Sequence, residues 1–165
     1  MSVETKANEQ YLTFMLGDET YALDIFRVCE VLEFSKATKV PRTPDFMRGV
    51  INLRGKVVPV IDLNRKFDLE QSEMTVNTCV IIVEVSREDG ERLTLGALAD
   101  SVKEVLEIET ANIEPPPDIG TKLSIDFIKG MGRHNGEFLI ILDIDRIFSA
   151  EELDLVKHDP EAGGP

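Results

Sequence analysis

The chain has 165 residues, 42% of them hydrophobic, which is enough for one domain with a substantial core or for two small domains that share one. Its 18 basic and 31 acidic residues leave a formal charge of −13. Because this charge repels phosphate backbones and anionic lipid headgroups, we expect no nucleic-acid partner.

The first runs of apolar residues predict strands. Residues 11–16 and 20–24 flank Gly17-Asp18-Glu19, a turn signal, and so predict a hairpin. Residues 25–32 fit strand spacing and helix spacing equally well, and we predict a strand from their β-branched content.

A second hairpin is expected from residues 50–53 and 57–62. Before it, residues 45–48 are expected to form one helical turn that ends at Gly49. Pro59 has no amide hydrogen for a sheet, so its strand should be an edge there or carry a bulge.

The second half of the chain shows the same pattern of short strands joined by turns. Residues 78–85 and 92–100 predict a third hairpin around Glu88-Asp89-Gly90, and residues 101–109 continue as a strand. A fourth hairpin is expected from residues 123–130 and 137–144.

Residues 145–156 change to helical spacing, with Ser149 as a candidate N-cap before Glu152. About nine strands and one short C-terminal helix predict an all-β barrel or sandwich. The polar stretch 68–77 separates two strand-rich halves, and we place a boundary there. Each half has only about 70 residues, which is marginal for a separate core, so the halves should pack together.

No segment resembles a targeting peptide, and no apolar run approaches the about 20 residues of a membrane helix. We therefore expect a cytoplasmic protein without direct membrane insertion. Cys29 and Cys79 each lie in an apolar stretch, which predicts two buried, reduced thiols.

The sequence contains no convincing catalytic, metal or cofactor site. His134 and His158 lie apart in polar surroundings, far from any nucleophile. Asp62, Asp143 and Asp145 each close an apolar strand, where an aspartate usually bonds a nearby turn or caps a helix.

These features favour a non-enzymatic protein that holds other proteins. Two other classes stay open as rivals. One is an esterase-like or nucleotide-dependent enzyme on a barrel, against which the missing nucleophile, base and phosphate loop count. The other is a small-molecule sensor with an apolar barrel mouth.

Three segments carry a family resemblance: YLTFMLGDETYALDIFRVCEVL, PRTPDFMRGVINLRGKVVPVIDL and LGALADSVKEVLEI. Together they resemble the bacterial chemotaxis coupling proteins of the CheW family, over about residues 10–155. The resemblance implies a single CheW-like domain of two intertwined five-stranded SH3-like barrels. We place its subdomains at about 15–67 and 78–144, with residues 1–9 and 159–165 as flexible tails.

The resemblance also implies a function. Members of the family bind the cytoplasmic tip of a methyl-accepting chemoreceptor and the regulatory domain of the histidine kinase CheA, which recruits them to receptor arrays at the membrane. The alternative is a coupling protein of a related pathway for pilus or surface motility. If the chain is complete, forms fused to a kinase or a receiver domain are excluded.

Individual residues are carried over from the family one at a time. The receptor-binding residues that the resemblance implies are Val28, Glu30, Arg54, Val102 and Val105, and we expect an Arg54 to Glu30 bridge. Gly55 and Gly96 match glycines associated with kinase binding. Ser101, where relatives often carry glycine, and the Gly-Gly-Pro tail depart from the family pattern.

Overall fold

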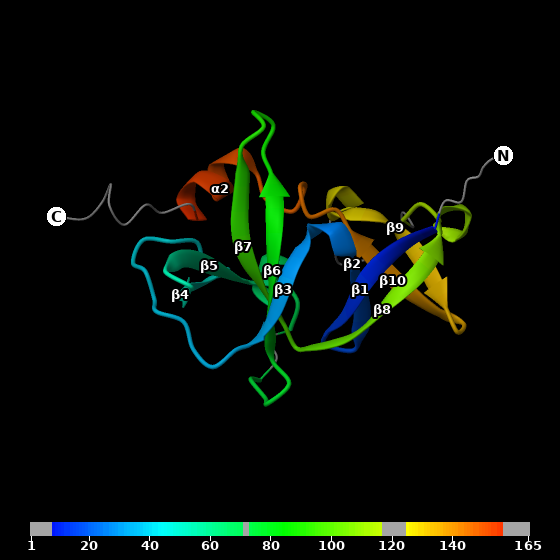
Figure 1. The fold of residues 1–165 in the computed structure, drawn as a ribbon, viewed down its shortest axis with the longest axis horizontal. Helices are drawn as coiled ribbons and strands as arrows, with labels where there is room; N and C mark the ends of the chain where they lie inside the picture. Colours follow the sequence, from blue (N-terminus) through cyan, green and yellow to red (C-terminus); the bar gives the residue numbers. More distant parts are fainter. Residues whose placement is uncertain (1–7, 71–72, 117–124, 157–165) are drawn as a thin grey trace.

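The computed structural model describes residues 8–70, 73–116 and 125–156, and within them it forms two five-stranded sheets (Figure 1). The strands are β1 (Asn8–Leu16), β2 (Glu19–Asp24), β3 (Val28–Glu33), β4 (Met47–Leu53), β5 (Lys56–Asp62), β6 (Cys79–Ser86), β7 (Arg92–Ala99), β8 (Ser101–Glu109), β9 (Ile128–His134) and β10 (Glu137–Leu142). The helices α1 (Leu63–Lys66) and α2 (Ala150–Val156) follow β5 and β10, and 3-10 turns occupy Ile25–Arg27, Thr110–Asn112 and Ile125–Phe127.

The two sheets exchange hairpins. The first sheet has the order β8-β1-β2-β10-β9 and the second has the order β3-β6-β7-β5-β4. The N-terminal hairpin β1–β2 thus completes the sheet of the C-terminal strands, and the hairpin β6–β7 completes the sheet of β3 to β5. The expected division into 15–67 and 78–144 is therefore wrong for the sheets, since each sheet draws strands from both halves.

A single bridge closes each sheet into a barrel. In the second sheet, Thr38 follows the outer strand β3 and exchanges two backbone hydrogen bonds with Val50 of the opposite outer strand β4, at 2.9 and 2.8 Å. In the first sheet, Glu114 follows β8 and bonds Met131 of β9 in the same way, at 2.8 and 2.7 Å. In each sheet the bridge links the two outer strands, and this closes the sheet into a barrel.

A glycine lies beside each closing bridge. A Cβ on Gly49 would stand 2.4 Å from the Thr38 carbonyl oxygen, and one on Gly130 would stand 3.1 Å from that of Glu114. The two glycines belong to an internal repeat in which FMRGVINLRGKVVPVIDLNRKF corresponds to FIKGMGRHNGEFLIILDIDRIF. At Gly49 the closing backbone itself leaves no room for a side chain, whereas at Gly130 the nearest atom to a Cβ would be Cγ2 of Ile113, at 2.5 Å.

The core has three parts. One cluster, including Tyr11, Leu106 and Ile141, belongs to the first sheet, and another, including Val58, Val80 and Ile82, belongs to the second. The largest draws on both sheets and on α2, including Phe14, Ile81 and Leu153. The all-β class, with two intertwined barrels on a shared core and a short C-terminal helix, is confirmed.

Three local predictions are wrong. In the strand expected over 123–130, residues 125–127 form a 3-10 turn and β9 begins only at Ile128. Residues 25–27 form a 3-10 turn because the Asp24 carboxylate accepts the Phe26 amide hydrogen, and β3 begins only at Val28. The expected helical turn at 45–48 is absent, since β4 already starts at Met47 and pairs with β5.

Other predictions hold in part. Ser149 and Glu152 bond each other's backbone amides, which confirms the cap of α2. Asn8 and Glu9 pair with β8 and so belong to strand β1, while the other residues of the two expected tails lie outside the described ranges. Neither cysteine is buried as expected: Cys29 is exposed, on the side of β3 that faces outward, and Cys79 is partly exposed.

Candidate functional site

The turn between β4 and β5 places an arginine in an unfavourable backbone conformation. Arg54 has φ 51° and Gly55 has φ 86°, so both central residues are left-handed, as a type I′ turn requires. Positive φ in this turn is therefore carried by Arg54 as well as by Gly55. The equivalent turn of the repeat, Asn135-Gly136, has φ 54° and 82° and uses asparagine, which tolerates this conformation better than arginine.

The expected bridge is present. The Arg54 guanidinium donates to both carboxylate oxygens of Glu30, through Nη2 to Oε2 and through Nη1 to Oε1 at 3.4 Å. The hydrogen bond to Glu30 raises the pKa of Arg54. Because the Arg54 side chain is 71% exposed, the bridge contributes little to folding stability, and what it orders is the surface.

Val28 and Val102 come from different sheets to the rim of the same core cluster. Val28 begins β3, Val102 lies near the start of β8, and both are partly buried against the shared core. Val105, further along β8, is 48% exposed. Because β3 follows β2 after a turn of three residues, it stands at the junction of the two sheets (Figure 1).

The outer strands β3 and β8 also carry matching segments, VCEVLE and VKEVLE. In this match Val31 corresponds to Val105, and its side chain is 38% exposed. Val31 was not among the residues expected at the receptor surface, although comparing these two segments would have found it.

The two glycines expected at the kinase surface differ. Gly55 is exposed, and its amide donates to Asn52 Oδ1 at 2.8 Å. Gly96 is buried in β7, where a Cβ would stand 2.6 Å from Val80 Cγ1. Gly96 therefore allows close packing inside the second barrel and does not itself present a surface.

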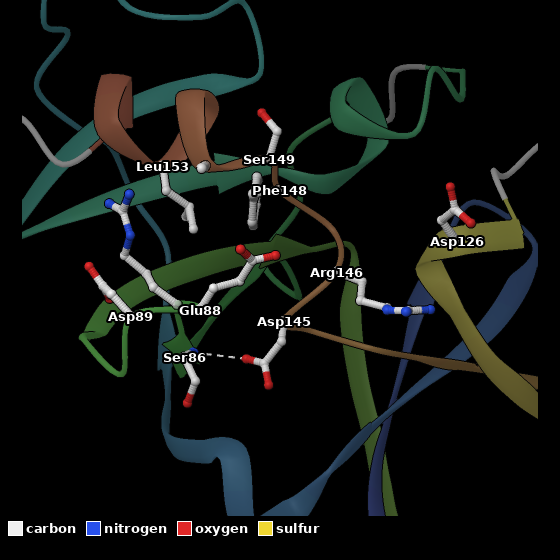
Figure 2. Close-up of a pocket in the computed structure, with 11 residues that line it drawn as sticks. Ser86, Glu88, Asp89, Asp126, Asp145, Arg146, Phe148, Ser149 and Leu153 are labelled. Carbon is white, nitrogen blue, oxygen red and sulfur yellow. Dashed lines mark hydrogen bonds between the residues drawn. The ribbon is translucent and has the colours of Figure 1, made fainter.

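A cavity of about 580 Å³ lies between the β6–β7 hairpin, the segment after β10 and the start of α2 (Figure 2). Asp145 stands on its wall and accepts the Ser86 amide hydrogen at 2.8 Å, the bond drawn in Figure 2. Asp145 also receives two hydrogen bonds from Arg27, at 2.9 and 2.5 Å.

Burial tends to raise the pKa of Asp145, but the hydrogen bonds from Arg27 and Ser86 outweigh it, so the pKa is lowered overall. Asp62 and Asp143 follow the expected pattern, since each accepts a backbone amide two or three residues ahead. Asp145 instead binds a residue far away in sequence, and nothing in the local sequence indicates it.

The remaining candidates take no part in this site. His134 is partly exposed at the end of β9, and His158 lies outside the described ranges. Within residues 8–70, 73–116 and 125–156, no group of three or more His, Cys, Asp or Glu is placed to hold a metal ion. In the same ranges no helix has the length and apolar character to span a membrane.

The fold and the site together define a β protein of two barrels on a shared core, with an ordered charge pair between β3 and the β4–β5 turn of the second barrel. The family model of the CheW-like domain matches residues 10–152, and the chain belongs to that family. Its role is that of a chemotaxis scaffold.

Individual relatives agree. A chemotaxis protein CheW of Klebsiella aerogenes is 36% identical over 90% of this chain and 86% of its own, and one of Treponema pallidum is 30% identical over 87% and 84%. The crystal structure of the scaffolding protein TtCheW from Thermoanaerobacter tengcongensis matches with a TM-score of 0.78 and 33% identity, over 91% of this chain and 92% of that one.

Proposed function

We propose that this protein is a non-enzymatic adaptor that couples methyl-accepting chemoreceptors to the histidine kinase CheA, so that receptors control kinase activity. The observation that carries the proposal is the match to CheW proteins over nearly the whole chain. The adaptor is cytoplasmic and reaches the membrane by joining receptor arrays.

The receptor surface of this proposal comprises Val28, Glu30, Arg54, Val102 and Val105, with Val31 added from the match between β3 and β8. It combines an apolar rim, supplied by both barrels, with a charge pair that holds its edge. Apolar side chains exposed beside ordered charges are typical of a protein interface.

The kinase surface includes Gly55 and the turn around it. Gly96 acts on this surface indirectly, because the packing of β7 against Val80 depends on it. A partner that recognises Gly55 reads the backbone of the turn, which is open to solvent.

Reconstitution tests the function directly. With purified kinase and a receptor cytoplasmic fragment, adding this protein is expected to make kinase activity depend on the receptor, and each pairwise binding should be measurable by calorimetry. No binding to either partner would sink the proposal. Turnover of nucleotides or esters that tracks the protein through repurification would favour the enzyme alternative instead.

The family alternative concerns the pathway and leaves the chemistry unchanged. A coupler for pilus or surface motility would bind receptors of that system in preference to those of chemotaxis. The relatives described above, which are named chemotaxis proteins, favour chemotaxis. Deleting the gene and scoring swimming against surface motility distinguishes the two pathways.

The variant Arg54→Asn separates the effect of the Glu30 bridge on receptor affinity from the effect of the turn conformation on stability. Asparagine occupies the equivalent position of the repeat, so we expect unchanged or slightly higher stability, while receptor affinity falls about threefold to tenfold because the charge-assisted bond is lost. Denaturant unfolding and receptor titration measure the two effects.

A double-mutant cycle with Glu30→Ala is the control for Arg54→Asn. The two losses of affinity should be less than additive, because each variant removes the same bridge. Strictly additive losses would show that the two side chains act separately, and full affinity in Arg54→Asn would return Arg54 to the status of a solvated charge.

A further inference from the structure

Arg27 lies at the point where the chain passes from the first sheet to the second. It ends the 3-10 turn Ile25–Arg27 between β2 and β3, and its guanidinium makes four hydrogen bonds. Two go to the carboxylate of Asp145, one goes to the Glu84 carbonyl at 2.9 Å and one goes to Ser86 Oγ at 3.4 Å.

These partners belong to both barrels. Asp145 follows β10 of the first sheet, whereas Glu84 and Ser86 lie in β6 of the second. The Arg27 and Asp145 side chains are only 27% and 33% exposed, and both carboxylate oxygens are engaged. A planar guanidinium held at this many points has one orientation, so the crossing segment is tied to both sheets at once.

The other crossing of the chain has the same design. Between β7 and β8, Asp100 accepts the Gly17 amide at 2.6 Å and the Asn64 Nδ2 hydrogen at 3.1 Å. In the internal repeat Asn64 corresponds to Asp145, so both crossings are held by the residue at the same place after a strand. The arrangement around Arg27 is thus one of two instances and not an isolated surface contact.

We propose that Arg27 and Asp145 form a positioning pair that sets the start of β3, and with it Val28 and Glu30, against the first barrel. The proposal rests on the proposed function of that surface in receptor binding. Arg27 precedes Val28 directly, and Val28 packs on the shared core, as does Val102 of the other sheet. Loss of the pair leaves each barrel intact and allows their junction to shift.

A surface that is already ordered loses less conformational entropy when it binds a partner. Loosening such a surface therefore weakens the complex even though no contact is removed. We therefore expect Asp145→Asn to lower receptor affinity about fivefold, the order of one charge-assisted hydrogen bond. Arg27→Ala should do the same, and the double variant should be no worse than the more affected single variant. Arg27→Lys keeps the charge but loses the planar fork, and it should recover only part of the affinity.

The matched control is Asp154→Asn. It removes the negative charge from the ion pair of Arg87 Nη1 with Asp154 Oδ1, at 2.8 Å. This pair joins the β6–β7 hairpin to α2 and does not involve the crossing segment. Receptor affinity of this variant should equal that of the wild type.

A second measurement distinguishes positioning from general destabilisation. Amide chemical shifts of Val28 and Glu30 should move in Asp145→Asn and not in Asp154→Asn, at temperatures where both are fully folded. This measurement needs no receptor, so it still tests the pair if the wild type binds none and the proposed function fails.

The result that overturns the proposal is a folded Asp145→Asn with wild-type receptor affinity and unmoved Val28 and Glu30 shifts. Equal losses in Asp145→Asn and Asp154→Asn would also overturn it. If Asp145→Asn does not fold, the milder Arg27→Lys decides: full affinity with unmoved shifts rejects the pair, and reduced affinity with moved shifts supports it.

Discussion

Gly49→Ala is expected to lower the free energy of unfolding by about 3 kcal/mol or more, because the added methyl overlaps backbone that cannot retreat. The new Cβ would lie 2.4 Å from the Thr38 oxygen and 2.8 Å from its carbonyl carbon, and Gly49 has φ 149°. The overlap can be relieved only if the bridge between Thr38 and Val50 breaks, and the second barrel is then no longer closed. Urea unfolding followed by circular dichroism measures the change.

Gly90→Ala is the matched control for Gly49→Ala. Gly90 also has positive φ, at 90°, but nothing lies within 4 Å of its would-be Cβ. Its substitution should therefore cost only the backbone conformation, about 1 kcal/mol. Equal losses in the two variants would mean that the closing bridge is not what requires glycine at position 49.

Val105→Asp is expected to weaken receptor binding about a hundredfold or more, because a carboxylate is buried without a partner in an apolar interface. The Val105 side chain is 48% exposed in the free protein, so the fold itself should tolerate aspartate. Val28→Asp is a less clean test, since Val28 packs partly against the shared core. Receptor titration combined with denaturant unfolding separates the two effects.

Val76→Asp serves as the control for Val105→Asp. Val76 is 93% exposed, lies between α1 and β6 and is not one of the residues assigned to the receptor surface. The variant adds the same charge and should bind the receptor as the wild type does. If both variants weaken binding alike, then net charge rather than the surface around Val105 is responsible.

Glu30 and Arg54 show how far the sequence can predict a contact. The bridge between them is predicted because the family resemblance assigns both residues to the receptor-binding surface, and an arginine can bind a carboxylate through two hydrogen bonds. The structure adds that Arg54 itself adopts positive φ, which is an unfavourable backbone conformation for arginine. The exposure of Arg54 then lowers the expected effect of its loss to about threefold to tenfold.

The pair of Arg27 and Asp145 shows where prediction ended. In the sequence, Asp145 is one of three aspartates that close an apolar strand, and Arg27 lies inside the strand expected over 25–32. Their contact joins positions that are 118 residues apart in the chain. It depends on how the two sheets pack against each other, which no repeating pattern of the sequence indicates. A local pattern cannot indicate such a contact.

The sequence by itself determined the all-β class, the hairpins and the capped C-terminal helix, because alternation, turn residues and caps act between neighbours in the chain. Only the tertiary structure decided that β1 and β2 join β8 to β10 while β6 and β7 join β3 to β5. The local sequence preferences of these hairpins are similar, so they do not decide which sheet each hairpin completes. The choice depends on the shared core, on the closing bridges beside Gly49 and Gly130, and on the side chains that hold the two crossings.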